Sequence, residues 1–284
     1  MYTFRIFPIP SDATVIINGL PQNEITTRGD ELITWEVSKT GYVKKSGSFT
    51  ITTNVDYNIE LIPTPILNIP FNNNFNELTG NNSVIAGGTA NFPTFVTGRR
   101  GTDFAASFNG SQSVKTSSNV LINGDKLSVS FWMKTTQTST AIIADLSNNT
   151  WQVPHNTVKT FTIGINENTP TWGGVGRLFS THTEVIDGRN PIFTNININD
   201  GNWRHFVITI DRALHSVIES KIYINGIISE EKLAASETEG DFINDILCIG
   251  QQHNNILGFN GQIQDFKLFD FILSIEDIER LYRE

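Results

Sequence analysis

Short segments in which apolar and polar residues alternate run along most of the chain and predict β-strands. In residues 127–134, valine, phenylalanine and methionine alternate with serine and tryptophan. Tight hairpin turns are indicated by Asn-Gly pairs, which supply positive backbone angles, at Asn109-Gly110, Asn123-Gly124 and Asn225-Gly226. The pattern therefore predicts an all-β chain rich in hairpins.

One short helix is expected at the end of the chain. Ser274 can accept from the first-turn amides, and Asp277, three residues later, can bond back to Ser274 as in a capping box. Ile275, Ile278 and Leu281 then form an apolar stripe at helical spacing.

Strict alternation is expected in the strand before this helix, residues 263–270. Ile263 and Asp265 would share one face, and Gln264 and Phe266 the other.

Prolines divide the chain into two domains, residues 1–63 and residues 64–284. Pro63 and Pro65 resist both helix and ladder pairing, so residues 62–66 are expected to form a short stiff linker. The first domain is small enough to be marginally stable alone.

Five blocks of the second domain, in order, resemble the laminin-G-like and pentraxin-like jelly rolls of the concanavalin A-like superfamily. They are residues 67–71, 105–110, 127–134, the pair 200–211 and 221–226, and 245–282. The resemblance implies a two-sheet sandwich. Most members of that group bind glycans or proteins, and a minority cleave sugars.

The first domain resembles the PEGA family of small β-sandwiches. The landmarks are an opening strand at 4–6, Ala13 to Val15, Asn18-Gly19 and Gly41-Tyr42, although Ser11-Asp12-Ala13 replaces the family's Pro-Glu-Gly-Ala. The expected fold class is thus all-β, with a small Ig-like or PEGA-like β-sandwich followed by a concanavalin A-like jelly roll with one short C-terminal helix.

Charge and cysteine content narrow the functional classes. The net charge of −9 argues against nucleic-acid partners, because neutralising phosphates requires clustered Lys and Arg. Cys248 is the sole cysteine, so it is expected to be a small buried residue and not part of a disulfide. The chain begins in a strand and contains no apolar stretch of about twenty residues, so neither Sec-dependent secretion nor membrane insertion is expected.

Two tryptophans, Trp132 and Trp203, lie within predicted strands. We expect each indole to fill the core between two sheets, in preference to stacking on a ligand.

Catalysis is not expected. Glucanases of the superfamily carry a Glu-x-Asp-x-x-Glu strand or a close variant, and the sequence has none. Glu276 and Glu279 lie in the predicted helix, while Glu230 and Glu231 follow a hairpin. The five histidines show no metal-ligand spacing, and no Gly-x-Ser-x-Gly elbow is present.

A weak calcium site is the main cofactor hypothesis. In pentraxin-like relatives the ligands come from two loops, which correspond here to residues 145–149 and 251–255. The metal-ligand candidates are Asp145, Asn149, Gln252 and Asn254. Calcium affinity depends largely on charge, so one carboxylate among neutral amides predicts millimolar binding or none, and no cofactor is otherwise expected.

The same loops are candidates for sugar binding, because aromatic faces stack on sugar rings and amides bond to hydroxyls. The candidate residues are Asn148, Trp151, His155, Trp172 and Asn254. An equally weighted alternative makes Trp151 and Trp172 a hydrophobic plug under a long loop.

The chain resembles modules that bind glycans or proteins, yet no secretion signal and no disulfide are expected. This combination favours a non-catalytic structural protein on the exterior of a tailed-phage particle. Such a protein is made in the host cytoplasm, joins other virion proteins, and can contact host-surface glycans through its jelly roll. The alternative is a carbohydrate-binding adhesin module on a bacterial cell surface. A glycan-cleaving enzyme is a third hypothesis.

Overall fold

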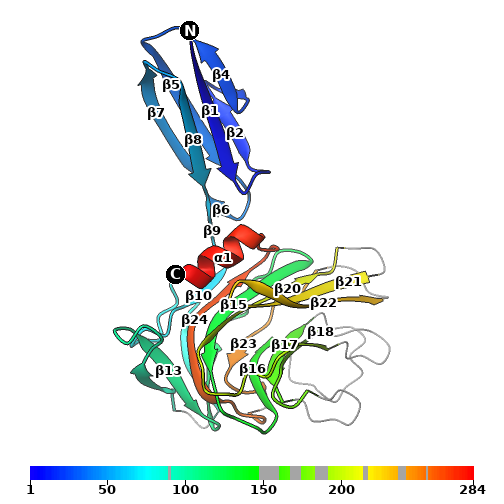
Figure 1. Ribbon diagram of the computed structural model, residues 1–284. Helices are drawn as coiled ribbons and strands as arrows, with labels where there is room; N and C mark the ends of the chain where they lie inside the picture. Colours follow the sequence, from blue (N-terminus) through cyan, green and yellow to red (C-terminus); the bar gives the residue numbers. More distant parts are fainter. Residues whose placement is uncertain are drawn as a thin grey trace. The chain divides into compact units, whose positions relative to one another are not determined.

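Two compact units make up the chain (Figure 1). The computed structural model describes residues 1–88, 91–146, 160–166, 174–182, 191–213, 217–235, 241–253 and 255–284. Unit 1 comprises Met1–Thr64 together with Leu273–Arg280, and unit 2 comprises Pro65–Ile272 with Leu281–Glu284. The sequence places residues 273–280 at the end of the second domain, whereas their contacts group them with the first.

Unit 1 is a small β-sandwich. Its strands are β1 Tyr2–Ile9, β2 Thr14–Ile17, β3 Leu20–Pro21, β4 Glu24–Thr27, β5 Glu31–Ser38, β6 Tyr42–Val43, β7 Lys45–Ile51, β8 Val55–Glu60 and β9 Ile62–Pro63. One sheet has the order β4-β1-β8, the other has the order β3-β2-β5-β7, and β6 pairs with β9. Strand β1 runs antiparallel to β4 and parallel to β8.

Alternation along the strands builds the core of unit 1. On β1, Phe4 and Ile6 point inward and are fully buried, while Phe7 is 47% exposed. The Phe4 ring meets the rings of Phe49 and Tyr57 edge-on, with centroids 4.9 and 5.2 Å apart. Burial of each such side chain contributes about 1.5–3 kcal/mol, which is substantial for so small a unit.

Pro63 departs from the prediction that it resists ladder pairing. It lies in β9 and pairs with Tyr42 of β6, and the next amide, Thr64 N–H, donates to the Gly41 carbonyl at 2.8 Å. A two-residue strand in a two-stranded ladder has a free edge, so the missing N–H of proline can face away from the partner.

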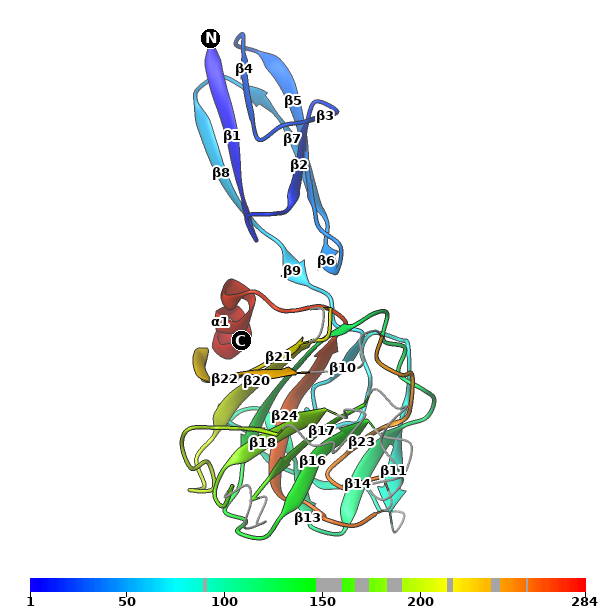
Figure 2. The same cartoon turned by 90° about the vertical axis from the view of Figure 1, so that its right-hand side faces the viewer.

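Unit 2 is a two-layered sandwich (Figure 2). Its strands are β10 Leu67–Ile69, β11 Val84–Gly88, β12 Thr94–Thr97, β13 Phe104–Asn109, β14 Gln112–Thr116, β15 Lys126–Lys134, β16 Ala141–Leu146, β17 Phe161–Ile165, β18 Leu178–His182, β19 Ile192–Phe193, β20 Arg204–Asp211, β21 Val217–Ile224, β22 Ile227–Ala235, β23 Leu247–Ile249 and β24 Asn260–Phe269. One sheet has the order β12-β13-β24-β15-β20-β21-β22, with β10 also paired to β24, and the other has the order β11-β14-β23-β16-β17-β18-β19.

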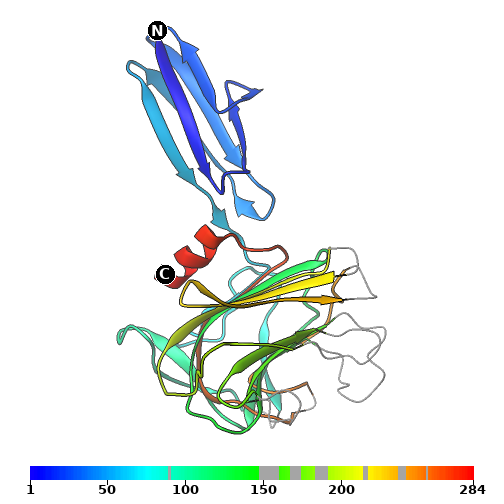
Figure 3. The ribbon, with the colours of Figure 1, turned by 45° about the vertical axis from the view of Figure 1, so that its right-hand side comes forward.

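The core of unit 2 lies between these two sheets, which face each other in Figure 3. On β15 the residues facing the core are Val129, Phe131 and Met133. Trp132 therefore faces outward, although it is only 8% exposed, and the prediction that it fills the core between the sheets is wrong. Trp203 lies one residue before β20 and is half-buried.

A β-bulge interrupts the alternation that was predicted for residues 263–270. Asp265 has a φ of 54°, and the register with β15 shifts beside it. The extra residue lets both Ile263 and Phe266 reach the core, whereas strict alternation puts them on opposite faces. Aspartate tolerates this left-handed backbone better than most residues.

Helix α1, Ile275–Arg283, begins with the predicted capping box. The Asp277 amide donates to Ser274 Oγ at 3.2 Å, and the Ser274 amide donates to Asp277 Oδ2 at 3.2 Å. Ile278 and Leu281 are buried as expected, but Ile275 is 49% exposed.

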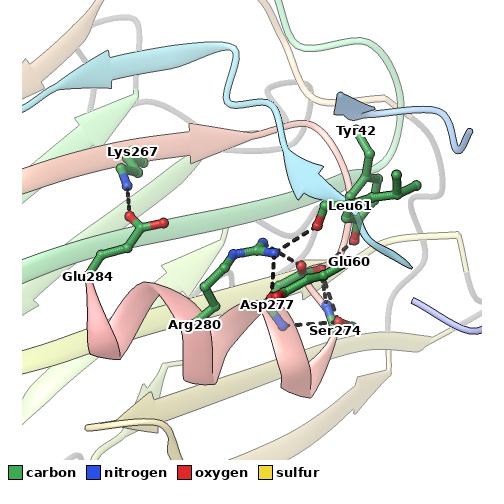
Figure 4. A network of polar contacts seen from close by, with 8 residues as sticks. All are labelled: Tyr42, Glu60, Leu61, Lys267, Ser274, Asp277, Arg280 and Glu284. Carbon is green, nitrogen blue, oxygen red and sulfur yellow. Dashed lines mark hydrogen bonds and ion pairs between the residues drawn. The ribbon is translucent and has the colours of Figure 1, made fainter. Parts of the chain in front are cut away.

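Polar contacts join α1 to the rest of unit 1 (Figure 4). Arg280 donates to Asp277 Oδ1 at 2.7 Å and to the Leu61 carbonyl at 2.7 Å, and the Tyr42 hydroxyl donates to Asp277 Oδ2. Burial, together with this bond to a carboxylate, raises the pKa of Tyr42. The phenol is therefore the donor at neutral pH.

No helix among the described residues combines the length and apolar character needed to cross a bilayer.

Candidate ligand-binding sites

A row of mostly polar residues crosses the outer face of the sheet that contains β16. On β16, Ala144 and Leu146 face the core, so Asp145 faces away from it. Strand register aligns Asp145 with residues of the same face on four neighbouring strands. This polar row is Lys115, Cys248, Asp145, Thr162 and Thr181.

Asp145 connects this sheet to the turn at residues 251–253. Thr162 Oγ1 donates to Asp145 Oδ1 at 2.8 Å, and the His253 amide donates to Asp145 Oδ2 at 3.0 Å. Lys115 Nζ then donates to the His253 carbonyl at 3.2 Å. Asp145 is completely buried, and these bonds offset part of the cost of burying its carboxylate.

Two amides in the same turn have oxygens that find no hydrogen-bond partner within the described part of the chain. They are Gln251 Oε1 and Gln252 Oε1, on side chains that are 4% and 2% exposed. A buried acceptor without a partner costs about 1–3 kcal/mol, and a ligand donor could remove that cost. The bond from the His253 amide places Asp145 beside the turn that contains Gln252, and their role as ligands stays a prediction.

The structure does not test the calcium hypothesis. Across the described ranges, no group of three or more His, Cys, Asp and Glu side chains is arranged to hold a metal. The remaining predicted site residues lie outside the described residues, namely Asn148, Asn149, Trp151, His155, Trp172 and Asn254.

Cys248 of the polar row is fully buried, as predicted. Burial raises the pKa of its thiol to about 11, so the reactive thiolate is scarce at neutral pH.

The outer face of the other sheet carries an aromatic and cationic stack. The Arg99 guanidinium lies 4.2 Å from the Trp132 ring centroid, and the Tyr282 ring stacks on Trp132 with centroids 5.7 Å apart. His205, opposite Trp132 on β20, is 2% exposed and bonds to Ser130 Oγ through Nε2 at 2.9 Å. Burial, with the nearby charges of Lys267 and Arg99, lowers the pKa of His205 to about 3.

One feature that sequence reasoning missed is a cavity of about 260 Å³ at an edge of the sandwich. Arg177, residues 191–193 and residues 230–232 line it. These segments are distant in sequence and carry no shared motif, so only the folded sheets bring them together.

Family comparisons divide the chain in two. Residues 108–279 match the family described as the concanavalin A-like lectin/glucanases superfamily, and residues 1–64 match the head fiber dimeric protein-like domain. The resemblance of the first domain to PEGA stays a prediction, because the family that matches residues 1–64 is a different one.

A curated relative matches the first unit. The head fiber dimeric protein of Bacteroides phage crAss001 is 42% identical to this chain over 64 residues. Those residues are 22% of this chain and 52% of the relative, so the match spans about half of the relative's length.

Solved structures resemble the second part of the chain. Domain 4 of AbnA, an extracellular arabinanase from Geobacillus stearothermophilus solved in complex with arabinotriose, has a TM-score of 0.56 at 19% identity, over 77% of this chain and 98% of that domain. The binding domain of Paraclostridial Mosquitocidal Protein 1 has a TM-score of 0.55 at 17% identity, over 77% and 51%. The receptor binding domain of botulinum neurotoxin C/D mosaic serotype has a TM-score of 0.54 at 19% identity, over 77% and 51%. At such identities the likeness concerns the fold, and it confirms the predicted all-β jelly roll.

Proposed function

We propose that this chain, which belongs to the concanavalin A-like lectin/glucanases superfamily, is a non-enzymatic structural protein on the exterior of a tailed-phage particle. Unit 1 is the mount that joins other virion proteins, and the jelly roll presents loops that bind glycans weakly. The chain is made in the host cytoplasm and acts in the virion.

The observation that carries this proposal is the 42% identity between residues 1–64 and a phage head fiber protein. The shared segment ends at Thr64, the residue before the jelly roll begins. A segment shared by two otherwise different chains suits an attachment role, since an attachment surface must match a common partner. We therefore favour the head of the particle over the tail.

Glycan binding is supported by the relatives of the jelly roll, which include a domain in complex with arabinotriose. The candidate residues are Asn148, Trp151, His155, Trp172 and Asn254. Single-site affinity is expected to be low, because these loops offer neutral amides and stacking rings. Many copies on one particle convert weak sites into strong adhesion.

The absence of catalysis is proposed from the positions of the carboxylates. Glu276 and Glu279 are exposed on helix α1, and Glu230 and Glu231 are exposed on β22. A retaining glycosidase needs two carboxylates about 5 Å apart across a bound sugar, and an inverting one needs about 6.5–9.5 Å. Release of reducing sugar from a glycan panel would contradict this part of the proposal.

The name of the phage relative also suggests self-association. Strands β7 and β8 are edge strands of the two sheets of unit 1, so their outer backbone groups are available for pairing. We propose that two copies associate through unit 1. Light scattering on the intact chain should then give twice the monomer mass of 31.6 kDa.

Purified particles provide the main test. Mass spectrometry should find the chain in the virion, and an antibody against the jelly roll should label intact particles. If the chain is absent from particles, or is detected only after they are opened, the proposed location is wrong.

The adhesin alternative draws support from the binding domains that share the jelly-roll fold. Neighbouring genes separate the two proposals. Capsid or portal genes beside this one favour the virion, whereas a secretion or anchoring locus favours the bacterial surface.

A further inference from the structure

The cavity at the sandwich edge lies between the last strands of the two sheets. Strand β19 ends one sheet and β22 ends the other, and Arg177 precedes β18. Lys232 Nζ donates to the Pro191 carbonyl at 3.2 Å and ties the two edges together. The cavity is therefore built by paired segments of the fold.

Two opposite charges line this cavity without pairing. Glu230 lies opposite Ile222, a core residue, so its side chain is on the inward side of β22. No ion pair within 4 Å joins Arg177 to Glu230 among the described residues, and neither charge is engaged elsewhere. Glu231, on the opposite side of β22, is instead held by Lys221 at 3.4 Å.

The lining combines two kinds of group that suit a sugar acid. The Arg177 guanidinium offers a planar pair of donors, which matches a carboxylate. The Glu230 carboxylate accepts from hydroxyls, and Phe193 of β19 also lines the cavity. The volume of about 260 Å³ lies just below the usual range of about 300–1,000 Å³ for small-molecule sites, which suits one sugar residue.

We propose that this cavity binds a single carboxylated sugar residue, such as a uronic acid, with its carboxylate on Arg177 and a hydroxyl on Glu230. The inference rests on the proposed glycan-binding function and names the class of sugar. It also places binding at a position separate from the Asp145 turn.

A purely structural reading of the same residues exists. Inward charges on an edge strand discourage edge-to-edge pairing between molecules. That reading requires no ligand, so a binding measurement distinguishes the two.

The test is a titration of the intact, nitrogen-15-labelled chain with methyl β-glucuronide and, separately, with its uncharged amide. We expect shifts at the Arg177 Nε–H and at the Phe193 and Glu230 amides, and binding of the amide at least ten-fold weaker. Arg177→Gln should weaken glucuronide binding at least ten-fold, and Glu230→Gln should weaken it several-fold. Arg100→Gln, another exposed arginine of unit 2, should bind like the parent.

Each contrary result has a distinct meaning. Equal binding of the acid and the amide overturns the role of the carboxylate, while sugar binding stands. No binding of either compound, or loss of binding in Arg100→Gln as well, overturns the cavity site. Neutral glycans bound by the loops near Asp145 would still support the proposed function, and particle labelling decides the virion location independently.

Discussion

Asp145 and Asp277 are both almost completely buried, at 0% and 2% exposure, but they accept hydrogen bonds from different kinds of donor. Asp277 Oδ1 faces the Arg280 guanidinium, and its Oδ2 faces the Ser274 amide as well as the hydroxyls of Tyr42 and Ser274. The guanidinium and the amide cannot act as acceptors, so each carboxylate oxygen of Asp277 faces one fixed donor. Asp145 faces one such fixed donor, the His253 amide, while its other oxygen faces the Thr162 hydroxyl, which can also accept.

The difference shows that burial alone does not decide how much the charge of a carboxylate contributes to the stability of the fold. An asparagine side chain can be flipped, but at position 277 its NH₂ group faces a fixed donor in both orientations. At position 145 the asparagine oxygen can accept from the His253 amide while its NH₂ group donates to Thr162. We therefore expect removal of the charge at Asp145 to keep the bonds to the His253 amide and to Thr162, which makes this position useful for testing ligands.

The largest expected effect comes from Asp277→Asn. We expect the free energy of unfolding to fall by about 3 kcal/mol, because the substitution removes the buried carboxylate partner of the mostly buried Arg280 and leaves only the exposed Glu60 carboxylate. Hydrogen exchange measured by mass spectrometry should show faster exchange in β6, β9 and α1. Glu276→Gln, an exposed neighbour, is the control, and an equal effect there would contradict the distinction.

The next largest effect on stability should come from acidification, because His205 is protonated more readily in the unfolded chain. Its pKa is lowered to about 3 in the folded protein, so the unfolded chain binds a proton first as the pH falls below about 6.5. Stability is then lost progressively from about pH 6.5 down to pH 3, by about 2 kcal/mol at pH 5. The slope of stability against pH should be smaller in His205→Asn, and an unchanged slope would show that another group titrates.

Asp145→Asn should cost about 1 kcal/mol, clearly less than Asp277→Asn, since a charge-assisted bond becomes a neutral one. Hydrogen exchange measured by mass spectrometry should be faster in β16, β17 and the turn at residues 251–253. Asp241→Asn, an exposed position in unit 2, serves as the matched control. If Asp145→Asn lowers the free energy of unfolding as much as Asp277→Asn does, the Asp145 carboxylate must neutralise a nearby positive charge.

Calcium should have the smallest effect. At about 1 mM ion and millimolar affinity, binding raises stability by about 0.4 kcal/mol. Calorimetry with and without chelator measures this gain, which Asp145→Asn should remove. A strong rise at micromolar calcium would show that the neutral turn at 251–255 had been misjudged.

Local rules predicted the features whose partners are close in sequence. The capping box forms because Ser274 and Asp277 are three residues apart and both lie in the first turn. The alternation of Val129, Phe131 and Met133 gave the core face of β15 correctly. The contact between Asp145 and the His253 amide joins residues far apart in sequence, and whether they hold a ligand stays a prediction.

Features set by register and long-range packing could not be predicted in this way. The bulge at Asp265 adds one residue to a strand, and nothing in the alternation of residues 263–270 shows which residue is extra. Trp132 is a different case, because its place in the alternation of residues 127–134 already puts it on the outer face, against the expectation that a tryptophan within a strand fills the core. Arg280 finds its partners 219 and 220 residues earlier, at Leu61 and Glu60, a distance no local pattern spans.

The grouping of residues 273–280 with unit 1 has a consequence for biosynthesis. Residues 1–64 leave the ribosome before residues 65–272, yet the segment that completes their compact unit is translated after those residues. At a translation rate of about 5–20 residues per second, roughly 10–40 s pass between the synthesis of residue 64 and the synthesis of that segment. A ribosome that stops before residue 273 yields a chain in which unit 1 lacks this segment. Chains with and without residues 273–280 thus differ in whether unit 1 is complete, a difference that a protease or chaperone can read.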